Sequence, residues 1–174
     1  MESPAFVLNV LTRNVQQVQK ALEGMKDADL RITPDAVKAN PAGWLVWHQS
    51  RFADMVLSHI GGKAQAWAEG QWAGKFPGVP SDLKKTGLGD TMEQVMAMNF
   101  PKEALSGYLN AVLEKAKSVL SGLASADFGR EIQHPLRAEK IKIGDLLAAM
   151  TTDFIQHSGQ VCYLRGYVTG PGWR

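Results

Sequence analysis

The second apolar segment of the chain, residues 40–59, reads NPAGWLVWHQSRFADMVLSH. Its apolar positions recur at spacings of three and four residues, which is the period of one face of an α-helix. That face carries Leu45, His48, Phe52, Met55 and His59. Asn is a strong N-cap and Pro is tolerated in the first turn, so we predict a helix that begins at Asn40-Pro41 and ends at Gly61-Gly62.

The same period appears in three other segments of the chain. We predict helices over residues 5–25 and 143–167, and a third long helix that Pro101 either opens or kinks. Residues 90–93 have the composition of a separate helix start, and residues 129–143 could form an irregular hairpin. Residues 70–89 hold five glycines and two prolines, so they form a long loop, either a surface excursion or a cover over a site. Four long amphipathic helices predict an all-α four-helix bundle, with room for a topology other than up-and-down.

The composition is that of an ordinary globular protein, which we expect to form a single domain over residues 1–174. Lysine and arginine number 19 against 17 aspartate and glutamate, and the net charge of +2 predicts neither nucleic acid nor an anionic membrane as a partner. Cys162 is the single cysteine, so no intrachain disulfide can form. With no signal-peptide pattern and no apolar run as long as a membrane span, we expect a cytoplasmic protein.

Three polar side chains interrupt the apolar faces of the predicted helices. His48 lies on the face of the second helix, and Asp153 and His157 lie four residues apart on one face of the last helix. A buried carboxylate is costly unless it is paired or coordinated. Two imidazoles and one carboxylate suit zinc, iron(II), nickel or manganese, and three protein ligands leave a position open to water or substrate. A salt-bridged helix pair beside a satisfied core histidine would explain the same residues without an ion.

Three short stretches carry a resemblance to a known family. One is NPAGWLVWH at residues 40–48, followed by Arg51 and Asp54. The second is DFIQHSGQ at 153–160, followed by YLRG at 163–166, and the third is TGLG at 86–89, followed by EQV at 93–95. Together they resemble the second helix, the fourth helix and the stretch before the third helix of the DinB-like (YfiT-like) superfamily of metalloenzymes. This superfamily is related to mycothiol-dependent maleylpyruvate isomerase-like proteins.

The resemblance implies a four-helix bundle in which two helices run parallel through a long crossover connection. It implies a divalent metal ion (zinc, nickel, iron or manganese) bound by His48, Asp153 and His157. Many members carry three histidines, and some carry glutamate where this chain has the shorter Asp153. Members of known activity are mostly thiol-dependent transferases or isomerases, and dimers are common. The resemblance therefore also implies a low-molecular-weight thiol, a small-molecule substrate and a homodimer.

Four other side chains near these motifs have an expected place. Arg51, three residues after His48, could hold a substrate anion at the mouth of the site or form a surface or interface salt bridge. Gln160, three residues after His157, could hydrogen-bond that ligand. His59 lies about 16 Å along the helix from His48, so it is expected to cap the helix end instead. Cys162 is expected to be buried and inert.

Two functions of different classes follow from these observations. The first is a metal-dependent enzyme in which the ion lowers the pKa of a bound thiol or water. The alternative is a non-catalytic bundle that binds a small ligand or a partner chain, which the long loop at residues 70–89 and the five tryptophans suggest. Asp153 distinguishes them, because a binding module would tolerate Asp153→Asn and an ion site would not. The sequence identifies no catalytic residue.

Overall fold

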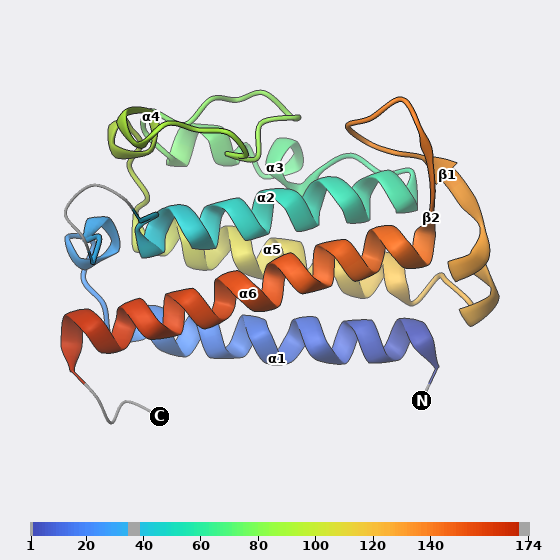
Figure 1. Cartoon of the computed structure of the whole chain (residues 1–174), viewed down its shortest axis with the longest axis horizontal. Coiled ribbons are helices and arrows are strands. Elements are labelled where there is room, and N and C mark those ends of the chain that lie inside the picture. The colour runs from blue at the N-terminus through green and yellow to red at the C-terminus, as the bar shows by residue number, and fades with distance from the viewer. Residues whose placement is uncertain (1, 35–38, 171–174) are drawn as a thin grey trace.

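Four long helices form the body of the protein, and a computed structural model describes residues 2–34 and 39–170. These helices are α1 (Ser3–Glu23), α2 (Ala42–Gly61), α5 (Lys102–Leu120) and α6 (Ile143–Thr169). Shorter elements connect them (Figure 1). They are η1 (Asp29–Arg31), α3 (Ala66–Glu69), η2 (Trp72–Lys75), α4 (Met92–Ala97), η3 (Ser125–Gly129), β1 (Glu131–Gln133) and β2 (Lys140–Lys142).

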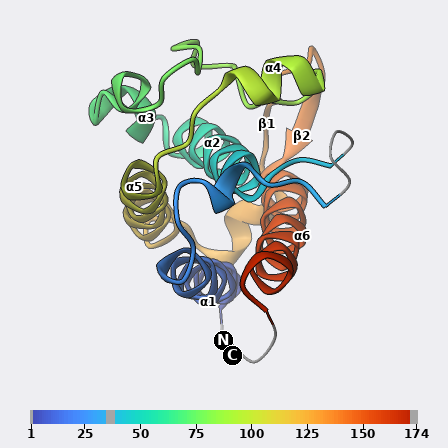
Figure 2. The same ribbon diagram turned by 90° about the vertical axis from the view of Figure 1, so that its left-hand side faces the viewer.

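The direction of the helices gives the bundle its topology. Helices α2 and α5 run parallel to each other, and α1 and α6 run in the opposite direction (Figure 1). Seen from the end, α2 packs against α5 and α6, and α1 packs against the same two helices from the other side (Figure 2). The connection between the parallel pair, residues 62–101, crosses the whole length of the bundle. The predicted all-α four-helix bundle with a long crossover is therefore confirmed.

The helix boundaries follow local backbone chemistry. Helix α2 begins one residue later than predicted, because Pro41 is the extended residue that precedes it and no side chain caps its first turn. It ends at Gly62, whose left-handed backbone (φ 59°) lets its N–H reach the carbonyls of Ser58 and His59. Thr91 starts α4 with a capping box, and Pro101 opens α5 as a separate helix.

The crossover lies against the outer face of α2 and buries it. Trp67 and Phe76, from the first half of the crossover, stack with ring centroids 5.5 Å apart, and both are almost wholly buried. Trp67 also meets Tyr108 of α5 edge-on at 5.1 Å. Because the crossover covers one side of α2 and the bundle the other, nearly every residue of α2 from Ala42 to Ser58 is buried.

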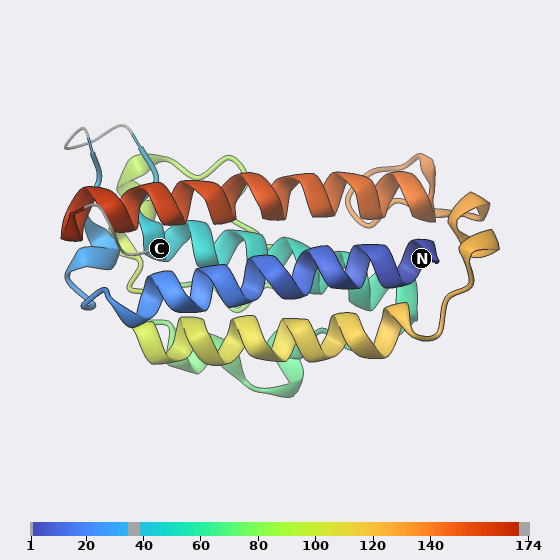
Figure 3. The same cartoon turned by 90° about the horizontal axis from the view of Figure 1, so that it is seen from below.

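The connection from α5 to α6 contains the predicted hairpin. Strands β1 and β2 pair antiparallel, with Ile132 opposite Ile141 (Figure 1). The connection that holds them lies at the end of the bundle where α6 begins (Figure 3). His59, which was expected to cap α2, reaches this hairpin, and its Nε2 lies 2.5 Å from the carbonyl oxygen of Gln133. Among the described residues, no helix is both long enough and apolar enough to cross a bilayer.

Candidate metal centre

The three polar residues of the apolar faces lie together where α2 meets α6. His48 comes from the middle of α2, and Asp153 and His157 stand one turn apart on α6. His48 Nε2 lies 3.6 Å from Asp153 Oδ1, and His157 Nε2 lies 3.3 Å from the same oxygen. One ligand atom of each residue lies within 4.8 Å of the others. The structure thus brings the predicted trio to one point.

These separations suit a small cation held between the three groups. Ligands about 2.1 Å from a tetrahedral ion lie about 3.4 Å from one another, which is close to the distances from Asp153 Oδ1 to the two imidazole nitrogens. The side chains are partly covered, with exposed fractions of 8% for His48, 25% for Asp153 and 17% for His157. Asp153 Oδ2 is buried and makes no hydrogen bond to any residue that the structure describes. A buried carboxylate oxygen without a partner is what a cation would satisfy.

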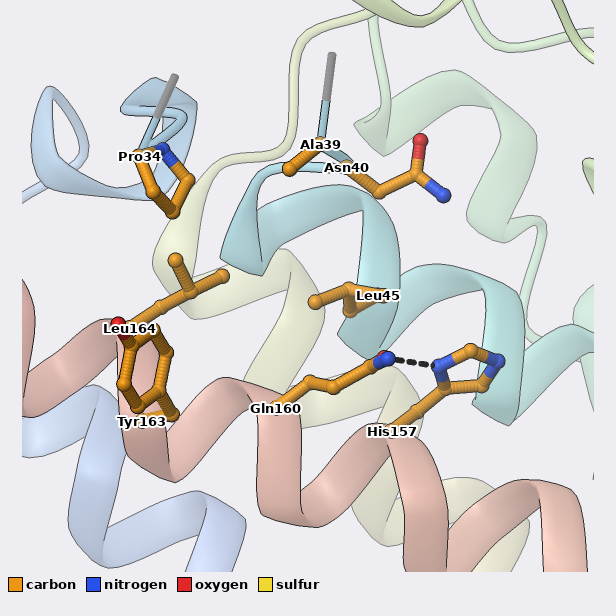
Figure 4. Close-up of a pocket in the computed structure, with 8 residues that line it drawn as sticks. All are labelled: Pro34, Ala39, Asn40, Leu45, His157, Gln160, Tyr163 and Leu164. Atoms are coloured by element: carbon orange, nitrogen blue, oxygen red, sulfur yellow. Dashed lines mark hydrogen bonds between the residues drawn. The ribbon is translucent and has the colours of Figure 1, made fainter.

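Both imidazoles are oriented by a hydrogen bond at the ring nitrogen that faces away from Asp153. His48 Nδ1 donates to the backbone carbonyl of Thr86 at 2.6 Å. His157 Nδ1 donates to Gln160 Oε1 at 2.6 Å, as expected for Gln160 (Figure 4). Because each Nδ1 carries a proton, each Nε2 presents its lone pair to the shared point when the ring is neutral. This is the tautomer that a metal ligand needs.

The charges of the trio depend on one another. Burial alone would raise the pKa of Asp153, but hydrogen bonds from His157 and His48, and the charges of the two rings, lower it to about 2. Burial alone would lower the pKa of His157, but hydrogen bonds with Asp153 and Gln160, and the charge of Asp153, raise it above 6.5. The positive charge of a protonated His157 therefore compensates the charge of Asp153, as a cation bound between the three residues would.

Aromatic rings close one side of the centre. The Trp44 ring stacks on the His48 ring at 4.6 Å with the two planes almost parallel. The His48 and His157 rings meet edge-on at 4.9 Å. Trp44 and Trp47 are both buried, and both rings belong to the hydrophobic core. The stacking restrains the His48 ring in the orientation that its hydrogen bond to Thr86 also fixes.

Arg51 does not lie at the mouth of the site or on the surface, where it was expected. Its side chain is fully buried and pairs with Asp54 at 3.6 Å. It donates to Tyr108 Oη at 3.0 Å and to the carbonyl of Leu83 at 2.9 Å, among other partners. The crossover covers this face of α2, so the guanidinium is occupied by the protein's own oxygens and is not available to a substrate anion.

The sequence did not reveal the network around Arg51. Asp54 accepts hydrogen bonds from the backbone N–H groups of Ala66 and Trp67, each at 2.8 Å, and from Tyr108 Oη at 2.8 Å. Burial, reinforced by the charge of Asp54, raises the pKa of Tyr108 well above 10. The available signal was the pair Arg51 and Asp54, three apart on an otherwise apolar helix. The network fixes the crossover to α2.

Comparisons with known proteins identify the family of the chain. The family model described as the DinB superfamily matches residues 11–161. The chain belongs to the DinB superfamily. The fold of a solved structure, the conserved protein of a locus from Enterococcus faecalis, matches with a TM-score of 0.85. It is 24% identical in sequence, with 98% of this chain and 99% of that chain covered, so the likeness shows the fold alone. No protein with a curated description matches.

A pocket of this DinB-superfamily chain adjoins the centre at His157. It has a volume of about 300 Å³ and lies between the start of α2 and the second half of α6 (Figure 4). The described residues that line it are Pro34, Ala39, Asn40, Leu45, His157, Gln160, Tyr163 and Leu164. His59 and Cys162 are not among them. Cys162 is buried on another face of α6, as expected.

Proposed function

We propose that this DinB-superfamily protein binds a divalent transition-metal ion through His48 Nε2, His157 Nε2 and Asp153, and uses it in catalysis. The observation that carries the proposal is the convergence of three ligand atoms within 4.8 Å from two helices that are distant in sequence. The unpartnered Oδ2 of Asp153 and the two Nδ1 hydrogen bonds support it. Two imidazoles and a carboxylate suit zinc, nickel, iron or manganese.

Three protein ligands leave room for a substrate or a thiol, so we propose a thiol-dependent transferase or isomerase that acts on a small molecule. When bound, the ion would lower the pKa of a thiol or water near it. The chain itself orients the ligands through Thr86 and Gln160, covers one face with Trp44, and gives access through the pocket beside His157. We also propose a homodimer, which sedimentation equilibrium would test.

Metal analysis tests the first part of the proposal. Protein purified without an affinity tag or added chelator should contain close to one equivalent of a transition metal, or take it up on titration. His48→Ala and His157→Ala should lose that metal while their circular dichroism stays helical. His59→Ala is the matched control, because this exposed histidine of α2 lies outside the centre. Full occupancy in the His48→Ala, His157→Ala double variant would refute the site.

A conjugation assay tests the catalytic part. Metal-loaded protein should accelerate the reaction of a low-molecular-weight thiol with monochlorobimane, in which the sulfur–carbon bond forms and chloride leaves. The acceleration should disappear in His48→Ala and persist in His59→Ala. If metal binds at the site but neither cysteine, glutathione nor another small thiol reacts faster, the thiol-dependent activity is wrong and the non-catalytic binding module remains.

A further inference from the structure

The pocket beside His157 gives information about the substrate. We propose that it binds an uncharged apolar group, an aryl ring with a short substituent or a branched alkyl chain, while the polar end of the same molecule reaches the metal centre. This inference rests on the proposed metal site and extends it to a class of substrate.

The walls of the pocket come from the segment before α2, from α2 itself and from α6, which meet beside the centre (Figure 4). The first turn of α2 contributes Leu45, and Asn40 lies just before that helix. Helix α6 contributes Tyr163 and Leu164, which lie about two turns beyond His157. Leu45 and Leu164 are both buried, with exposed fractions of 3% and 5%, so their positions are set by the core. The apolar wall that these two leucines form is therefore a fixed part of the bundle.

The volume of the pocket limits the group that fits. A cavity of about 150 Å³ in a protein interior is large enough for benzene. The pocket measures about 300 Å³, so it holds one six-membered ring with a short substituent, or a branched alkyl chain of similar size. Small-molecule sites in proteins begin at about this volume. A larger, fused ring system would extend out of the pocket.

The chemistry of the walls selects an uncharged group. Leucine side chains and the ring of Tyr163 give an apolar surface, and the amides of Asn40 and Gln160 give the polar atoms. Apart from His157, no described residue that lines the pocket has an ionisable side chain that is charged near neutral pH. A carboxylate in this pocket would lose its hydration without gaining a cation among these residues, which costs more than burying a neutral ring.

Two residues join the pocket to the centre. His157 lines the pocket and also faces Asp153 at 3.3 Å. Gln160 lines the pocket and holds His157 through its Oε1. A molecule whose apolar part fills the pocket therefore contacts a residue of the proposed ligand set. The pocket and the centre together describe one binding site with an apolar end and a metal end.

Hydroxamates that differ only in their apolar part test this inference on zinc-loaded protein. Isothermal titration should show benzohydroxamate binding at least about tenfold more tightly than acetohydroxamate, because the ring is removed from water. 4-Carboxybenzohydroxamate should bind only slightly more tightly than acetohydroxamate, because its carboxylate would have to enter the pocket. Equal affinity of benzohydroxamate and acetohydroxamate, or tighter binding of the carboxylate, would overturn the proposal.

Variants locate the effect. Tyr163→Ala and Leu164→Asn should each reduce the preference for benzohydroxamate over acetohydroxamate severalfold. Tyr163 is 68% exposed, so its removal is not expected to disturb folding, whereas Leu164→Asn alters a core position. Ile155→Ala is the matched control, because Ile155 is an exposed apolar residue of α6 outside the pocket. An unchanged preference in Tyr163→Ala would contradict this placement of the ring.

A metal-free measurement separates this inference from the proposed function. Benzyl alcohol titrated into metal-free protein should shift the methyl NMR signals of Leu45 and Leu164 more than those of leucines outside the pocket. If these signals shift but the protein takes up no metal, the metal site is refuted and the pocket is supported. If the protein takes up metal but shows neither these shifts nor a preference for the aryl hydroxamate, the pocket proposal is wrong and the metal site is supported.

Discussion

Asp153 interacts with both imidazoles through one oxygen, while its other oxygen is buried with no hydrogen-bond partner among residues 2–34 and 39–170. The carboxylate stays charged because the rings lower its pKa to about 2, against the effect of its own burial. In the metal-free protein, protonation of His157, whose pKa the contact with Asp153 raises, supplies compensating positive charge. A divalent ion held by His48, Asp153 and His157 would supply that positive charge instead.

Asp153→Asn keeps the shape of this side chain and removes its charge. We expect the affinity for zinc or nickel to fall by at least about a hundredfold, since even residues that only support a metal ligand are worth about ten- to a hundredfold. Competition with a chelating dye measures it. Asp145→Asn, at an exposed position of the same helix, should leave the affinity unchanged. Wild-type affinity in Asp153→Asn would favour the non-catalytic binding module.

Metal-free stability should depend on pH through the same residues. The raised pKa of His157 means that its contact with Asp153 stabilises the fold fully below pH 6.5 and less as pH rises through the folded-state value. The lowered pKa of Asp153 means that its charged carboxylate stabilises the fold above about pH 4, and that this stabilisation is lost as pH falls toward 2. The stability of the wild type relative to Asp153→Asn should therefore be greatest between about pH 4 and 6.5. Urea denaturation at pH 5 and pH 8 measures the difference, and a larger difference at pH 8 would contradict it.

At the scale of elements, helix α2 shows what the sequence could and could not predict. The period of its apolar residues places His48 on the buried face of α2, and the same period places Asp153 and His157 on the buried face of α6. The three residues were therefore predictable as a group. Arg51 was not, because the period of one helix says nothing about which segment covers its outer face. The crossover buries that face, and its carbonyls come from Leu83 and Lys85, more than 30 residues away in sequence.

Arg51→Met tests the role of this buried cation. Removal of the guanidinium leaves Asp54 charged and buried, with its backbone and Tyr108 donors in place, and strands the carbonyls that Arg51 satisfied. Breaking a buried pair in this way costs about 3–5 kcal/mol, and we expect a loss of that size in the free energy of unfolding. Arg13→Met, on the exposed side of α1, should change it by less than about 0.5 kcal/mol. Similar unfolding curves for both variants would show that Arg51 is not structurally important.

Gly87 carries the crossover past the aromatic rings of α2 and so places Thr86. Its φ is +95°, and a Cβ there would lie 2.7 Å from the Trp44 ring and 2.8 Å from the Trp47 ring. Gly87→Ala should therefore displace the carbonyl that orients His48, destabilise the fold by more than about 1 kcal/mol, and weaken metal binding. Gly89→Ala is a matched control, because Gly89 has φ +83° with no atom within 4 Å of the added Cβ. If both variants bind zinc equally, the orienting role of this turn is wrong.

At the scale of the whole molecule, the centre links α2 to α6 across the interface between the two halves of the chain. The four-helix architecture could be predicted because each long helix carries its own apolar period. The parallel run of α2 and α5 was an implication of the family resemblance, since no local pattern fixes the direction in which a 40-residue connection returns. An ion at this junction would bind the folded bundle more tightly than the unfolded chain, where His48 is far from Asp153 and His157.

Metal binding should therefore raise the melting temperature of the whole bundle. Free metal at a hundredfold its dissociation constant stabilises the folded state by about 2.7 kcal/mol. For a chain of this length each kcal/mol corresponds to roughly 2–4 °C, so we expect a rise of about 5–11 °C with zinc or nickel. Differential scanning calorimetry measures it, with His59→Ala expected to shift like the wild type. A comparable rise in His48→Ala would mean that the ion stabilises the protein from a different place, because α2 then no longer supplies its ligand.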